Sequence, residues 1–234
     1  KDNDIVLDYF SGSGTTAEAV FNYNLENRKN LKFILIQIAE DIDKTLKLMN
    51  AGEKNIALKS INFLDKYRKP HFITEIGKER IRRAGEKIKA DNPLTTQDLD
   101  IGFRVFKVDS SNMNDVYYSA GEYSQDMLVN LEDNIKPDRT DLDLLFGCLL
   151  DWGLPISLPY TSEQIENCTV HTYNDGDLVA CFDENIPESV IKEIAKRKPL
   201  RAVFRDAGFG SSPEKINVTE IFKMLAPDTD VKVI

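Results

Sequence analysis

The hydrophobic and polar positions of the first forty residues predict a strand, a glycine turn, a helix and a second strand. The apolar runs at residues 4–10 and 33–38 are typical of parallel strands that are buried on both faces. Residues 15–27 predict a helix, and its candidate packing positions are Ala17, Ala19, Val20 and Tyr23. The crossover of such a strand–helix–strand unit is right-handed in nearly all proteins. We therefore expect a wound parallel sheet here.

The following part of the chain predicts one clear helix. Residues 43–69 show a mixed pattern of helix and loop without a clear motif. Between residues 73 and 89, apolar positions form one stripe of a helix and basic positions form an adjacent face. The residues of the apolar stripe are Ile73, Gly77, Ile81, Ala84 and Ile88. Those of the basic face are Arg80, Arg83 and Lys87. The sequence DNPLTT at 91–96 ends this helix, and the alternation in 102–108 predicts a third strand.

The last hundred residues predict a separate unit. After a polar connection at 112–139, we expect Thr140 to cap a helix over 141–152, whose apolar positions are Leu142, Leu145, Phe146, Leu149 and Trp152. Residues 169–173 and 178–182 predict a hairpin, because the Asp-Gly pair between them supplies the positive φ angles of a tight turn. A helix, a strand, a helix and an edge strand follow at 187–198, 201–206, 212–225 and 230–234.

These elements predict an α/β protein of two parts. Residues 1–118 form a partial Rossmann-like sheet with the basic helix, and residues 119–234 form a smaller α/β domain for assembly or dimerisation. The apolar stripe of helix 141–152 is either an ordinary core stripe or a subunit interface.

The distribution of charge points to a polyanionic partner. The net charge of −9 disfavours nucleic acid when taken alone, but nine basic residues and only three acidic ones lie between Lys66 and Lys89. That segment carries +6 and the remainder −15. We expect Arg80 and Arg83, one helical turn apart, to contact DNA phosphates or to pack against the rest of the first part of the chain, residues 1–118. The alternative is a helix face exposed to solvent.

Composition excludes several other classes of site. No apolar run approaches the roughly 20 residues of a membrane helix, so we expect no membrane partner. The three cysteines lack CxxC spacing, which favours reduced thiols in a cytoplasmic protein over a disulfide framework, and we expect no metal site. His71 and His171 lie far apart without a nucleophile motif, so a hydrolytic triad is disfavoured and His171 is expected on the strand surface.

The glycine turn is a candidate nucleotide site. Gly12 and Gly14 let the backbone approach a ligand, and the helix that follows offers free N–H groups. A Walker P-loop is excluded because Thr15, and no lysine, follows Gly14. Together with Ala17 the two glycines satisfy the relaxed dinucleotide pattern GxGxxG/A, which keeps a NAD-binding oxidoreductase half as an alternative.

The residues around this turn resemble a known signature. Asp8-Tyr9-Phe10-Ser11-Gly12-Ser13-Gly14-Thr15-Thr16 is similar to the D-x-F-x-G-S-G-T-T motif of methyltransferases that modify exocyclic amino groups in DNA. The resemblance implies S-adenosyl-L-methionine as the cofactor. It also implies that the turn and the hydroxyls of Ser13, Thr15 and Thr16 surround the methionine part, that Asp8 lies near the amino group, and that Phe10 lines the pocket.

A second cofactor element departs from the family pattern. The family carries a glutamate after the next strand, which accepts the ribose hydroxyls, whereas Gln37 stands at that position here and Glu40 lies three residues later. Either Gln37 or Glu40 is expected to bind the ribose, or Gln37 is only a polar residue at the end of a strand.

Three further stretches narrow the family. Residues 73–89, 102–113 and 201–234 resemble the carboxyl-terminal half of modification subunits from type III restriction–modification systems. This resemblance implies a homodimeric DNA methyltransferase that acts at N6 of adenine and serves a restriction subunit.

The motif with which that family holds the target base is not in this sequence. The family holds the target amine with an Asp/Asn-Pro-Pro-Phe/Tyr tetrapeptide beside a flipped base. The nearest strings here, DNPL at 91–94 and LPY at 158–160, lack the second proline and ring or the acceptor. We therefore expect no catalytic residues, and a carboxyl-terminal fragment whose catalytic motif lies upstream. A non-catalytic interaction module is a further alternative.

Overall fold

A computed structural model describes residues 1–97, 99–114, 134–209 and 212–234. The protein is a mixed α/β chain that divides into two compact units, Lys1–Phe103 and Arg104–Ile234. The expected fold class is confirmed, whereas the boundary expected at 118/119 lies outside the described residues. No helix of the described part is both long and apolar enough to cross a membrane.

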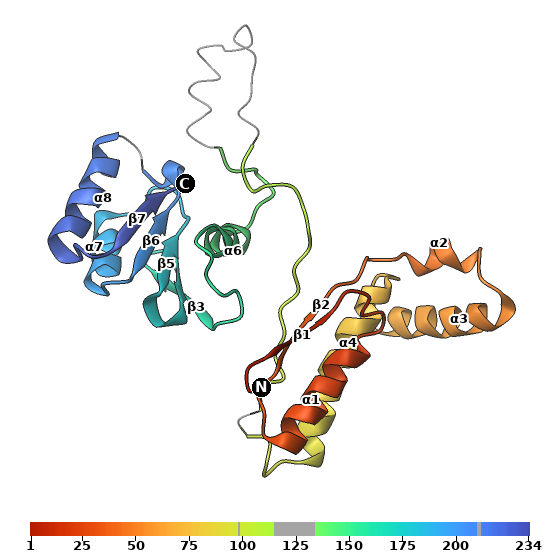
Figure 1. Ribbon diagram of the computed structural model, residues 1–234. Helices are drawn as coiled ribbons and strands as arrows, with labels where there is room; N and C mark the ends of the chain where they lie inside the picture. The colour runs from red at the N-terminus through yellow and green to blue at the C-terminus, as the bar shows by residue number, and fades with distance from the viewer. Residues whose placement is uncertain (98, 115–133, 210–211) are drawn as a thin grey trace, which may run out of the picture. The chain divides into compact units, whose positions relative to one another are not determined.

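The first unit begins with the expected strand, helix and strand. β1 (Ile5–Asp8) runs parallel to β2 (Lys32–Leu35), and α1 (Thr15–Asn27) connects them (Figure 1). Ile5 lies opposite Lys32, and Asp8 lies opposite Leu35. The carboxyl ends of both strands therefore meet at the same edge, beside the glycine turn.

The prediction that these strands are buried on both faces is wrong. Phe33 and Leu35 pack into a cluster with α1 and α4, which covers one face of the sheet. On the other face, Ile5 is 59% exposed, and Leu7 and Ile34 are nearly half exposed. The apolar run predicts a strand with two covered faces, but the described part of this unit supplies helices for only one of them.

Three helices complete the first unit. α2 (Ile42–Leu46) and α3 (Ala51–Lys66) occupy the region where only a mixed pattern was expected. The start of α3 is marked by a capping box that the sequence contains as Asn50 and Glu53: the Asn50 side chain accepts from the Glu53 N–H, and the Glu53 carboxylate accepts from the Asn50 N–H. α4 (Ile73–Asp91) confirms the predicted helix, and four of its five stripe positions are buried: Gly77, Ile81, Ala84 and Ile88.

The third strand predicted at 102–108 is not formed. This stretch is extended but has no strand partner among the described residues. Its alternation has another cause: the Arg104 guanidinium donates to the carbonyl oxygens of Ile156 and Leu158, and both Arg104 and Phe106 contact the Phe146 ring. Side chains two residues apart therefore anchor this stretch to the second unit without a sheet ladder.

The second unit is built on a five-stranded sheet in the order β3-β4-β5-β6-β7. The strands are β3 (Tyr160–Ile165), β4 (Cys168–Tyr173), β5 (Leu178–Cys181), β6 (Arg201–Phe204) and β7 (Asp230–Val233). The first two pairings are antiparallel and the last two are parallel. The β4–β5 hairpin and the edge strand β7 were predicted, and β3 was missed.

Helices cover both faces of this sheet. α7 (Glu188–Lys196) and α8 (Ser212–Leu225) pack on one face, and α6 (Asp141–Asp151) packs on the other (Figure 1). Leu145 and Leu149 of α6 are fully buried, so these two stripe positions belong to the core. Thr140 caps α6 as predicted, in a reciprocal arrangement with Asp143.

The expectation for His171 is corrected. Its side chain is only 5% exposed, because α6 covers this face of β4. Ser162 Oγ lies 2.8 Å from its Nδ1, and Asp141 Oδ2 lies 3.4 Å from its Nε2. In serine hydrolases the serine engages Nε2 and the aspartate engages Nδ1, the reverse of this order. We interpret the three residues as a set of polar contacts that connects β3, β4 and the start of α6.

Candidate cofactor-binding site

The candidate site is the turn between β1 and α1. Gly12 and Gly14 have φ angles of +51° and +76°, the left-handed region in which a side chain is strained. The Gly14 N–H donates to Ser11 O at 2.7 Å, which closes the turn. Gly14 is also the N-cap of α1 and provides no side-chain cap, so the first N–H groups of the helix are directed toward the space beyond the turn.

α4 supports this turn through close backbone packing. A Cβ at Gly14 would lie 3.3 Å from Gly77 O, and a Cβ at Gly77 would lie 3.5 Å from Gly12 O. Gly77 sits inside the helix, where glycine is unfavourable by roughly 1 kcal/mol relative to alanine. The apolar pattern predicts Gly77 only as one position of a helical stripe, although a glycine inside a helix is itself a signal of close approach.

Asp8 organises the turn from the end of β1. Its carboxylate accepts from Thr16 Oγ1 at 2.5 Å and from the Phe10 N–H at 3.1 Å. A carboxylate has about four acceptor positions, so Asp8 retains capacity for a further donor. Phe10 is 89% exposed at the rim of the turn.

Gln37 closes the other side of the turn. Its Oε1 accepts from the Gly12 N–H at 2.8 Å, and its Nε2 donates to Ile38 O. The structure therefore brings Gln37 to the glycine turn, where the sequence could only place it after the second strand. Glu40 is exposed, and its carbonyl oxygen accepts from the Ile73 N–H at the start of α4.

The remaining predicted cofactor residues lie on the same turn. Ser13 is half-buried, Thr15 is exposed, and Thr16 is half-buried where it binds Asp8. All the cofactor residues expected from the sequence thus occupy the carboxyl edge of the two-stranded sheet or the connection after it. What they bind stays a prediction.

The basic face of α4 is engaged with neighbouring groups. Arg80 forms an ion pair with Glu18 of α1 at 3.4 Å, the packing alternative that the sequence left open. Arg83 binds Glu79 at 2.8 Å and stacks over the rings of Phe63 and Tyr67. The Arg83 guanidinium holds the pKa of the Glu79 carboxyl below its usual value, since a hydrogen bond and charge favour the ionised form.

An open depression of about 460 Å³ lies over α3 and α4. Four basic side chains and two acidic ones contribute to its lining: Lys59, Arg80, Arg83, Lys87, Glu18 and Glu79. The excess of positive charge persists after the ion pairs are counted. This surface therefore favours an anion, and phosphate groups are one candidate.

The two strings nearest to a base-gripping motif have structural roles. In DNPL, Asn92 ends α4 and its Nδ2 donates to Ile88 O. In LPY, Leu158 O accepts from Arg104, and the Tyr160 ring packs edge-on against Phe146.

Comparison with known proteins identifies two relatives that match more than nine tenths of the chain and one that matches less than half of it. The Mod subunit of the type III restriction–modification enzyme EcoP15I from Escherichia coli is 25% identical over 232 residues, which is 95% of this chain and 30% of that subunit. The EcoPI Mod subunit of Escherichia phage P1 is 27% identical over 226 residues, 92% of this chain and 30% of that subunit. The StyLTI Mod subunit of Salmonella typhimurium strain LT2 is 36% identical over 103 residues, 44% of this chain and 13% of that subunit.

No protein-family model matches the chain. The chain spans less than a third of the length of these curated relatives, but two of the matches extend over nearly all of its residues. The two matches that extend over more than nine tenths of the chain cover residues of both compact units. This protein is therefore related to the Mod subunits of type III restriction–modification enzymes.

Proposed function

We propose that this chain is part of an S-adenosyl-L-methionine-dependent DNA methyltransferase of a type III restriction–modification system, with N6 of adenine as its target. The observation that carries the proposal is the β1–α1 turn: two glycines in the left-handed region, Asp8 bound to Thr16, and Gln37 bound to the Gly12 N–H. The three relatives are Mod subunits of type III restriction–modification enzymes, which supports the type III system and the modification role.

The groups of the turn suit a methionine moiety. Asp8 would accept hydrogen bonds from the ammonium group, while the uncapped start of α1 and the hydroxyls of Ser13 and Thr15 would bind the carboxylate. Thr16 donates its hydroxyl hydrogen to Asp8 and would hold that carboxylate in place. The cofactor supplies an activated methyl group on its sulfonium. Phe10 would cover the pocket.

In this proposal Glu40 binds the ribose of the cofactor. Gln37 Oε1 is already bound to Gly12, so its amide is committed to holding the turn. The exposed Glu40 carboxylate can accept from both hydroxyls of a diol, and Gln37 Nε2 keeps one further hydrogen for the same ligand.

Methyl transfer itself requires groups outside this sequence. The chain contains no Asp/Asn-Pro-Pro-Phe/Tyr tetrapeptide, so we propose that it binds cofactor but transfers no methyl group alone. The methyltransferase part corresponds to residues 1–118 and the assembly part to 119–234. Homodimerisation, a restriction subunit and a cytoplasmic location complete the proposal.

Calorimetric titration of S-adenosyl-L-methionine into the purified chain tests cofactor binding. We expect one site, loss of at least tenfold in affinity in Asp8→Ala and Gly14→Ala, which corresponds to about 1.4 kcal/mol, and unchanged affinity in Gly153→Ala. Gly153 is a matched control because it also has a positive φ of +63° but lies in the second unit, with open space around it.

Titration of NAD⁺ under the same conditions separates the two cofactor classes. Binding of NAD⁺ in preference to S-adenosyl-L-methionine would refute the methyltransferase proposal and favour the oxidoreductase half suggested by the GxGxxA spacing. Binding of neither would favour an interaction module.

Contact between DNA and the basic face of α4 is a separate part of the proposal. We expect the Arg80→Gln/Arg83→Gln double variant to weaken binding of a fluorescent duplex and to reduce the slope of log K against log salt by about 2, since each phosphate contact contributes roughly one unit. Lys192→Gln/Lys196→Gln is the control, because these α7 lysines are also spaced by one turn and paired with carboxylates. An unchanged slope in the α4 variant eliminates the phosphate role.

A further inference from the structure

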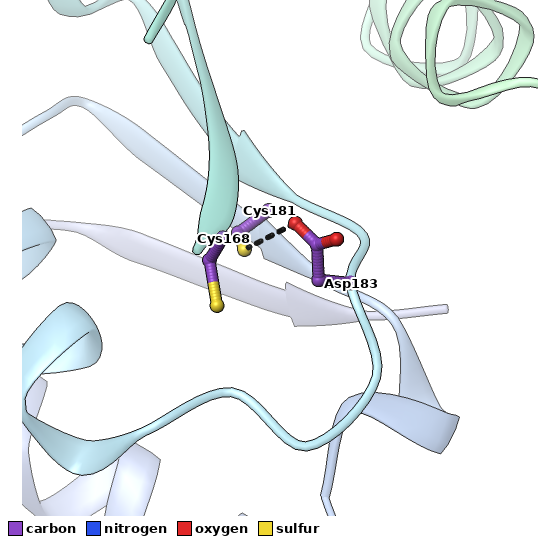
Figure 2. Close-up of side chains that lie close together, drawn as sticks. All are labelled: Cys168, Cys181 and Asp183. Atoms are coloured by element: carbon purple, nitrogen blue, oxygen red, sulfur yellow. Dashed lines mark hydrogen bonds between the residues drawn. The ribbon is translucent and has the colours of Figure 1, made fainter. Parts of the chain in front are cut away.

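Three potential metal ligands converge at one end of the β4–β5 hairpin. Cys168 is the first residue of β4, Cys181 is the last residue of β5, and Asp183 follows two residues later. Figure 2 shows the three side chains close together, with Cys181 hydrogen-bonded to Asp183. Because Cys181 lies opposite Val170 in the antiparallel register, Cys168 is its diagonal neighbour on the same face of the sheet.

The ligand atoms are nearly at the spacing that a metal ion requires. Both Sγ atoms and a carboxylate oxygen lie within 4.8 Å of one another, and Cys181 Sγ is 3.8 Å from Asp183 Oδ2. Zn–S bonds of about 2.3 Å and Zn–O bonds of about 2.0–2.2 Å place tetrahedral ligand atoms about 3.5–3.8 Å apart. Closing the site therefore needs side-chain shifts of about 1 Å.

The surroundings hold the ligands in place. Cys168 and Cys181 are 5% and 0% exposed and pack in the core beside α7 and α8. The half-buried Asp183 carboxylate accepts from the Thr169 N–H at 2.5 Å, a backbone contact of the kind that orients metal ligands. Asp183 is the only one of the three ligands that is not fully buried.

We propose that Cys168, Cys181 and Asp183 bind one Zn²⁺ ion, with a water molecule from the Asp183 side as the fourth ligand. Two thiolates and one carboxylate suit zinc, because thiolates select soft or borderline ions and zinc accepts mixed sulfur and oxygen ligands. The two thiol protons leave to solvent as the two Zn–S bonds form, and no electron transfer is involved. The ion would join β4 to the connection between β5 and α7.

A disulfide between the two cysteines is the main competitor. Cys168 and Cys181 are diagonal neighbours in the antiparallel register and are 5% and 0% exposed, so an oxidant in solution has little access to either thiol. The half-buried Asp183 carboxylate adds a third ligand that a disulfide would not use. The two states exclude each other, and the mass of the unreduced chain distinguishes them.

Titration of Co²⁺ into the reduced, metal-free chain tests the site, because cobalt bound to thiolates gives a charge-transfer absorption that oxygen ligands do not. We expect one equivalent to bind and Zn²⁺ to displace it. Cys168→Ser and Cys181→Ser should each weaken binding by at least about 100-fold and reduce the absorption, since even residues that only orient a ligand change metal affinity by 10–100-fold.

Cys148→Ser is the matched control. Cys148 is equally buried but packs with α6 on the opposite face of the sheet, so its loss should leave the titration unchanged. Asp183→Asn should keep the thiolate absorption with weaker affinity. Circular dichroism of each metal-free variant shows whether the fold is retained, and a variant that does not fold is replaced by the corresponding Cys→Ala change.

Three results would overturn the proposal. The first is absorption that survives in both Cys168→Ser and Cys181→Ser, and the second is absorption that disappears equally in Cys148→Ser. The third is an unreduced chain whose intact mass lacks two hydrogens, mapped to a Cys168–Cys181 bond, together with no binding of cobalt after reduction.

Discussion

The close approach of the glycine turn to α4 can be measured with three alanine substitutions. In Gly12→Ala, the new Cβ would have only Phe10 O at 4.0 Å, so the cost is the strain of the left-handed backbone, roughly 1–2 kcal/mol. Reduced freedom of the unfolded chain offsets about 0.4–1 kcal/mol of this. We expect a net destabilisation of about 1 kcal/mol.

Gly14→Ala adds a steric term to the same strain. Its Cβ would lie 3.3 Å from Gly77 O and 3.4 Å from Gly77 Cα, both backbone atoms that can move only with α4. Overpacking of this kind costs about 1–3 kcal/mol. We therefore expect Gly14→Ala to destabilise the first unit by about 2–4 kcal/mol, clearly more than Gly12→Ala.

Gly77→Ala should have the opposite sign. Its Cβ would contact Gly12 O at an ordinary 3.5 Å, and alanine stabilises a helix interior by roughly 1 kcal/mol over glycine. The variant should be neutral or slightly stabilising, which also shows that the turn tolerates a methyl group from the α4 side.

Hydrogen exchange of α1 and α4 peptides is the suitable assay, because it reports opening of the first unit alone. The single tryptophan, Trp152, lies in the second unit and provides an internal check that this unit is unchanged. Equal destabilisation by Gly12→Ala and Gly14→Ala, within about 0.5 kcal/mol, would refute the close contact with α4.

Three further predictions concern single contacts. The protonated His71 ring donates to the carboxylates of Asp43 and Asp65, and these hydrogen bonds, with Asp43 the larger cause, raise the pKa of His71. The contribution of His71 to stability is therefore complete below about pH 6.5 and is lost as the pH rises through the folded pKa. NMR titration should show the raised pKa, and Asp43→Asn should lower it. Thr140→Ala removes the cap of α6 and should cost about 1 kcal/mol in urea unfolding followed by Trp152 fluorescence. Leu145→Ala empties a fully buried position and should cost about 2–5 kcal/mol in the same assay.

These three predictions can be checked with one control variant and two further observations. Leu150 of α6 is 65% exposed, and Leu150→Ala should change the free energy of unfolding by no more than about 0.5 kcal/mol. The Thr140 hydroxyl bonds to Asp143, whereas His171 bonds to Ser162 and Asp141. The contacts of His171 should therefore persist in Thr140→Ala. A His71 pKa at or below its ordinary value would contradict the two ion pairs.

Local signals were the reliable part of the sequence. α1 and α4 were predicted because their apolar positions recur with helical spacing over several turns, and the β4–β5 hairpin because the Asp175-Gly176 pair favours the positive φ angles of a tight turn. The structure gives both residues a positive φ, and Asn174 as well. β3 was missed because its exposed residues outnumber its partly buried ones, so the strand shows no apolar alternation. The opposite error occurred at residues 102–108, where the alternating pattern predicted a strand that is not formed. There the alternation reflects contacts of Arg104 and Phe106 with Phe146.

The sequence by itself determined the order of most helices and strands, the glycine turn and its family resemblance, because each depends on neighbouring residues. Only the tertiary structure decided which distant groups meet: Gln37 with Gly12, Gly77 with Gly14, and Cys168 with Cys181 and Asp183. The physical reason is that strand register and helix packing are set by burial of the whole core, and no short-range pattern encodes the distance between side chains brought together in that way.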